Sequence, residues 1–179
     1  MKRNIMTLLI TVFAMLQATA QTYDNLWKQA DIIAQKDQPK SEIGVMKKII
    51  SKASAAKDYG QLMAAEMRQM ILWKEISADS LTPNVKRMET EALKAKDPVL
   101  KAVRYAVLGK VYREVNGKKS EEFFKKALEQ PELLARNAST GYVPLTLKGV
   151  DGSSFNNDLL HLIGFEGQQG GVSVDVHLL

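Results

Sequence analysis

The chain has 179 residues, with 25 Lys and Arg, 20 Asp and Glu and no cysteine. Without cysteine it has no disulfide framework, no thiolate metal site and no cysteine nucleophile. The formal charge of +5 is small, and basic side chains are spread among acidic ones instead of forming a block, which argues against a nucleic-acid partner.

The first twenty residues have the pattern of a secretory signal peptide. Lys2 and Arg3 precede an apolar run from Ile5 to Leu16, and the small residues Ala18 and Ala20 follow. We expect cleavage after Ala20 and no stable membrane insertion afterwards, because the run is shorter than the roughly 20 residues that span a bilayer. The sequence thus predicts an exported protein, either periplasmic or associated with the cell envelope.

Residues 21–137 are predicted to form a helical-hairpin domain. Apolar residues recur there at intervals of three and four, which predicts about six helices. The first two helices are separated at Gln38-Pro39, since proline suits a first helical turn. Asp58 with Gln61 predicts a capping box at the start of the third helix.

The remaining helix boundaries follow from prolines and capping residues. The fourth helix is predicted to open at Thr82-Pro83 and the fifth at Asp97-Pro98. Asn116-Gly117 can end the fifth in a left-handed conformation, and Ser120 can cap the sixth. A short helical continuation is expected at 132–135.

The odd-numbered helices start near residues 23, 59 and 98, a recurrence of roughly 36 to 39 residues that is typical of stacked helical hairpins. Leu108–Tyr112, followed by Phe124, Ala127 and Pro131, resembles a tetratricopeptide repeat. The predicted fold class is all-α, a short solenoid of antiparallel hairpins. In this solenoid Tyr105 and Tyr112 are the candidate partner-binding residues of a concave groove.

The C-terminal part of the sequence lacks the regular helical spacing of apolar residues. Residues 138–166 are predicted to be a linker with a candidate short strand at Val143, Leu145 and Leu147 and a short helix capped by Asn156, Asn157 or Asp158. Residues 167–179 are glycine-rich, and we interpret them as a disordered or aberrant tail.

No constellation of residues points to catalysis. Asp158 and His161 could share a helix face, but a zinc site needs three or four ligands, so a local polar pair or helix cap is favoured. Met63, Met67 and Met70 form a stripe with Trp73 that is interpreted as core packing ahead of an adaptable binding groove. We predict no enzyme activity, no catalytic residue, no metal and no cofactor.

Four stretches are similar to one known family. They are Tyr23–Lys28, Ser51–Leu62, Lys96–Leu100 and Phe155–His161, and they resemble the N-terminal helical region of secreted alpha-2-macroglobulin family proteins of Bacteroides-type bacteria. The resemblance implies a role in inhibiting endopeptidases that attack the cell envelope. It ends after Phe165, so we interpret the chain as a fragment or truncated form.

Members of that family trap proteases with further β domains, and some use a thioester formed from cysteine and glutamine. Because this chain has no cysteine, the resemblance implies a non-catalytic module that acts by protein–protein or interdomain contact. The alternative is a stand-alone periplasmic adaptor of the tetratricopeptide type that binds peptides or proteins.

Overall fold

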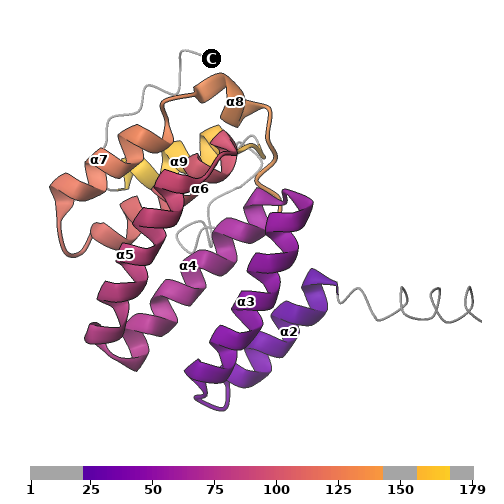
Figure 1. The fold of residues 1–179 in the computed structure, drawn as a ribbon. Coiled ribbons are helices and arrows are strands. Elements are labelled where there is room, and N and C mark those ends of the chain that lie inside the picture. The colour runs from indigo at the N-terminus through magenta and orange to yellow at the C-terminus, as the bar shows by residue number, and fades with distance from the viewer. Residues whose placement is uncertain (1–21, 143–156, 170–179) are drawn as a thin grey trace, which may run out of the picture.

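The computed structural model describes residues 22–142 and 157–169. Within these ranges the chain forms eight helices and no strand, which confirms the all-α prediction (Figure 1). The helices are α2 (Tyr23–Ala34), α3 (Pro39–Ala56), α4 (Tyr59–Ile76), α5 (Ala78–Lys94), α6 (Pro98–Tyr112), α7 (Gly117–Ala127), α8 (Pro131–Ala135) and α9 (Leu159–Gln168).

Successive helices pack against one another as hairpins. α2 packs on α3, α4 on α5 and α6 on α7, while α4 also contacts α6. Figure 1 shows the pairs side by side, from indigo α2 to orange α7. Two apolar clusters fill the interior, one among α2, α3 and α4 and a larger one from α3 to α9. Because the chain has no disulfide, burial of this apolar surface is the main source of stability.

Two predicted helix starts are confirmed at atomic detail. The Asp97 carboxylate accepts hydrogen bonds from Val99 N at 2.9 Å and Leu100 N at 3.2 Å. Asp58 accepts from Gln61 N at 3.3 Å. Gln61, however, does not complete the capping box, because its Oε1 accepts a hydrogen bond from Trp27 Nε1 at 2.7 Å and so ties α4 to α2.

The predicted start at Thr82-Pro83 is wrong. α5 begins at Ala78, and Pro83 lies inside it. Ser77, in an extended conformation, accepts a hydrogen bond from Ser80 N at 3.1 Å. Leu81 packs against the core, so tertiary contacts hold the first turn in place ahead of the proline.

The predicted cap at Ser120 is also wrong. Asn116 caps α7, accepting from Lys119 N at 3.1 Å, and its backbone is extended instead of left-handed. Ser120 is buried and donates to the Gly109 carbonyl oxygen at 2.7 Å. A Cβ on Gly109 would lie 2.7 Å from the Phe124 ring, so a small residue is required where α6 meets α7, as the repeat resemblance implies.

The predicted short C-terminal helix is present as α9. Asp158 accepts from His161 N at 2.9 Å, and α9 packs on α6, α7 and α8. The described end of the segment 138–166 is therefore part of the helical core. Gly167 and Gln168, assigned to the tail, belong to α9. The signal peptide at 1–20, the candidate strand at Val143–Leu147 and the rest of the tail from residue 170 lie outside the described residues.

Within the described residues, every helix is too short or too polar to cross a lipid bilayer.

Candidate functional site

The two tyrosines predicted to bind a partner lie where α6 meets its neighbours. Tyr105 is buried, and its ring centroid lies 5.9 Å from that of Phe123. Tyr112 stacks on the same ring, with centroids 5.6 Å apart and an interplanar angle of 10°. Tyr105 also borders a cavity of about 160 Å³ between α6, α7 and α8.

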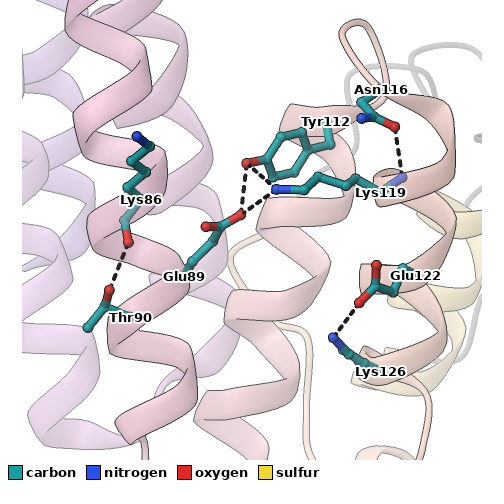
Figure 2. A network of polar contacts seen from close by, with 8 residues as sticks. All are labelled: Lys86, Glu89, Thr90, Tyr112, Asn116, Lys119, Glu122 and Lys126. Carbon is teal, nitrogen blue, oxygen red and sulfur yellow. Dashed lines mark hydrogen bonds and ion pairs between the residues drawn. The ribbon is translucent and has the colours of Figure 1, made fainter.

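A polar network holds the Tyr112 hydroxyl in place. It donates to Glu89 Oε1 at 2.8 Å, and Lys119 Nζ lies 3.2 Å from both oxygens. Figure 2 shows Lys119 extending from α7 toward Glu89 on α5. Burial and the bond to Glu89 raise the pKa of Tyr112. A partner-binding role for Tyr105 and Tyr112 stays a prediction.

A larger depression crosses a different part of the fold. Two cavities of about 300 and 370 Å³ share Met67, Ile71 and Lys110 and thus form one continuous surface, here called the α2–α4–α6 groove. Its further lining residues are Trp27, Ala30, Asp31, Ala34, Glu42, Ala64, Arg68, Met70, Lys74, Leu81, Val111, Glu114, Val115 and Tyr142.

The groove contains two large apolar side chains that are exposed in the described part of the fold. Ile71 is 40% exposed and Val115 is 74% exposed. Met67 and Met70 are buried beneath them. The predicted packing of the methionine stripe is therefore confirmed, and its outer edge also lines the groove. Flexible thioethers at such a place allow the surface to adapt to different ligands.

The cation in the middle of the groove is fixed from behind. Lys110 Nζ lies 2.8 Å from Oε1 of Glu166 and 3.2 Å from the Tyr142 hydroxyl, which donates to the same carboxylate at 3.0 Å. Glu166 is only 2% exposed. Burial and the Glu166 carboxylate raise the pKa of Tyr142 above its ordinary value. Lys110 is thus part of a network contributed by α6, α9 and the turn before residue 143.

Ion pairs border the groove at both ends. Arg68 and Glu42 pair through two hydrogen bonds of 2.7 and 3.1 Å. Lys74 and Glu114 form an ion pair between α4 and the turn after α6. An apolar strip bordered by charges is the usual composition of a protein-binding surface.

The Asp158 and His161 pair serves the start of α9. His161 Nδ1 lies 2.8 Å from Asp158 Oδ2, and Asp158 also caps the helix. The pair is therefore a local polar pair and helix cap, as the sequence analysis favoured. Over residues 22–142 and 157–169, no three side chains of the types that ligate metals come together.

Sequence reasoning missed the groove residues Ile71, Lys74, Lys110 and Val115. The available signal was weak, since an isolated exposed Ile or Val is common on protein surfaces. No protein-family model matches the chain, and no characterised protein or solved structure is detectably similar to it.

Proposed function

We propose that this chain is a non-catalytic helical module of an exported alpha-2-macroglobulin-like endopeptidase inhibitor, and that it binds a protein segment in the α2–α4–α6 groove. The supporting observation is the apolar strip with Ile71 and Val115 at its surface. Contiguous exposed apolar surface is characteristic of interaction sites. The lineage rests on the sequence resemblance alone.

The second candidate, a stand-alone periplasmic adaptor, uses the same groove. Its helical hairpins and its flexible methionine floor suit short apolar peptides. The two candidates differ in the occupant, which is a macroglobulin domain in the first case and a separate peptide in the second.

Binding assays with two probes separate the candidates. One probe is a macroglobulin domain encoded in the same genome, and the other is a set of short peptides selected on the purified protein from a displayed random library. Ile71→Asp places a charge in the groove and is expected to weaken binding by about tenfold or more, because the charge must be desolvated. Leu93→Asp is the control, since Leu93 is 67% exposed and lies outside the groove.

Preferential binding of the macroglobulin domain supports the first candidate, and selection of apolar peptides alone supports the second. Equal losses in the Ile71 and Leu93 variants, or no binding of either probe, would refute a function of the groove. Circular dichroism of both variants should match that of the wild type, because both side chains are substantially exposed.

Export is a separate part of the proposal and rests on the signal pattern at residues 1–20. Protein recovered from the cell envelope is expected to begin at Gln21 when its N-terminus is sequenced. A chain that retains Met1 and stays in the cytosolic fraction would contradict export.

A further inference from the structure

The last turn of α9 lies at the edge of the α2–α4–α6 groove. Glu166, in that turn, pairs with Lys110, which lines both cavities of the groove. The Glu166 carbonyl oxygen also accepts a hydrogen bond from Arg113, and the two residues that follow Arg113 in the sequence line the groove as well. The chain therefore leaves α9 beside the groove, because Gln169 follows Glu166 by only three residues, a rise of about 5 Å in a helix.

The sequence shortly after Gln169 is apolar at every second position. We call residues 172–178 the 172–178 segment. Aliphatic residues alternate there with polar ones, in the order Val172, Ser173, Val174, Asp175, Val176, His177 and Leu178. In an extended chain such an alternation places the aliphatic side chains on one face and the polar side chains on the other. One face of the segment is therefore suited to an apolar surface.

The 172–178 segment is also long enough to follow the groove. The groove runs along α4 from Ala64 to Lys74, a distance of roughly 15 Å at the rise of an α-helix. Seven extended residues span about 23 Å. Gly170 and Gly171 precede the segment, and glycine permits the change of chain direction that is needed between α9 and the groove.

The charges of the groove do not favour a strongly charged occupant. Its lining contains three acidic and three basic residues, namely Asp31, Glu42, Glu114, Arg68, Lys74 and Lys110. All three basic residues are already paired with carboxylates of the described fold. An occupant therefore gains affinity mainly by covering the exposed side chains of Ile71 and Val115. The 172–178 segment, with four aliphatic residues and one acidic residue, has the matching composition.

We propose that the 172–178 segment lies in the α2–α4–α6 groove of its own chain, with its aliphatic face against Ile71 and Val115 and its polar face toward solvent. Attachment to α9 raises the effective concentration of the segment at the groove, so a weak intrinsic affinity is sufficient. A protein segment that binds in the groove must then displace it, which makes the 172–178 segment an internal competitor. Only this competition rests on the proposed function, whereas the contact within the chain does not.

A spin label on the 172–178 segment tests this contact in the full chain. Because the chain has no cysteine, His177→Cys provides a single labelling site on the polar face. A nitroxide attached there is expected to broaden the amide signals of Ile71 and Val115 in nuclear magnetic resonance spectra and to leave the signal of Leu93, outside the groove, sharp. Sharp groove signals, or equal broadening at Leu93, would overturn the proposal.

A mixture of two preparations distinguishes a contact within one chain from a contact between copies. One preparation carries the spin label without isotopes, and the other carries isotopes without the label. The groove signals of the isotope-labelled chain are expected to stay sharp in this mixture. Broadening as strong as in the singly prepared chain would place the segment in the groove of a second copy and would contradict the proposal.

Two aspartate substitutions in the labelled chain test the role of the aliphatic face. Val174→Asp places a charge on this face and is expected to lower the ratio of bound to free segment by about tenfold, because the charge must be desolvated. Ser173→Asp, on the polar face, is the matched control and should preserve the broadening. Equal effects of the two substitutions would refute the proposed orientation. Both positions lie outside α2 to α9, so circular dichroism of both variants should match that of the wild type.

Ligand binding separates this inference from the proposed function. If the segment competes for the groove, Val174→Asp should tighten the binding of the macroglobulin domain or the selected peptide by up to about tenfold, and Ser173→Asp should not. Ligand affinity that is unchanged by Val174→Asp would refute the competition and leave the function of the groove intact. Broadening by the spin label without any ligand binding would support the contact within the chain and refute the proposed function.

Discussion

Replacing Gly60 by alanine tests whether the turn at residues 139–141 is packed against the start of α4. A Cβ at Gly60 would lie 1.9 Å from the Thr140 carbonyl oxygen and 2.5 Å from that of Ser139. Both are backbone atoms, so no side-chain rotation relieves the contact. Overpacking of this kind costs about 1 to 3 kcal/mol, and we expect the free energy of unfolding to fall by that amount.

Gly44 provides the matched control within the same fold. It lies in α3, and a Cβ there would have no heavy atom within 4 Å. Because alanine is a better helix former than glycine by roughly 1 kcal/mol, Gly44→Ala should stabilise the protein. The two identical substitutions are thus expected to have opposite signs.

Urea denaturation followed by far-ultraviolet circular dichroism measures both changes. The turn could also detach in Gly60→Ala without global unfolding. That escape would break the hydrogen bonds from Ser139 N to Asn157 O at 3.0 Å and from Leu159 N to Asn137 O at 2.8 Å, and hydrogen exchange at Ser139 and Leu159 would accelerate. If Gly60→Ala is as stable as Gly44→Ala and both amides stay protected, the packing argument is refuted.

Three further substitutions test the core and its charges. Gly109→Ala should lower the free energy of unfolding by about 1 to 3 kcal/mol, because its Cβ would press on the Phe124 ring; a thermal melt with no loss would contradict this. Glu66→Gln tests the raised pKa of about 7 against an ordinary 4.5. A carboxyl with a raised folded-state pKa stabilises the fold below 4.5 and loses this contribution as pH rises through about 7, a change on the order of 3 kcal/mol. The variant should lack this loss in urea melts between about pH 5 and about pH 8, and parallel curves would exclude the mechanism. Asp97→Ala should cost about 1 to 2 kcal/mol at neutral pH by removing the α6 cap. Burial opposes ionisation of Asp97, but hydrogen bonds from Tyr59 and two backbone amides hold its pKa below 3.8 overall. The stabilisation by the Asp97 carboxylate is therefore lost as pH falls. In the variant, the free energy of unfolding should consequently fall less steeply at acidic pH.

Local signals in the sequence were sufficient for much of the fold. Asp58 and Asp97 each place a capping oxygen beside a run of periodic apolar residues, and both helices start where these residues predict. Such caps satisfy backbone donors within a few residues of themselves, so no knowledge of distant contacts is needed.

The errors arose where distant contacts decided the outcome. Ser77 starts α5 ahead of Pro83 because Leu81 packs on the core. Ser120 is buried because α6 passes directly beside it, and its hydroxyl bonds to Gly109 instead of capping. The helix propensities and capping preferences of single residues do not show which of several possible start positions tertiary packing will favour.

The candidate sites were less accessible to prediction. Both sides of α6 carry apolar residues, so the sequence does not indicate which side meets α7 and which borders the groove. Tyr112 is involved in the network with Glu89, while Lys110 and Val115 line the groove.

The attachment of Lys110 to Glu166 links the shape of the groove to the docking of α9. Any compound that gains affinity from the Lys110 side chain in its observed position must, by thermodynamic reciprocity, hold α9 more firmly against α6. Loosening α9 would conversely release the lysine and lower that affinity. The docking of α9, the last described helix, therefore influences the affinity of ligands that contact Lys110.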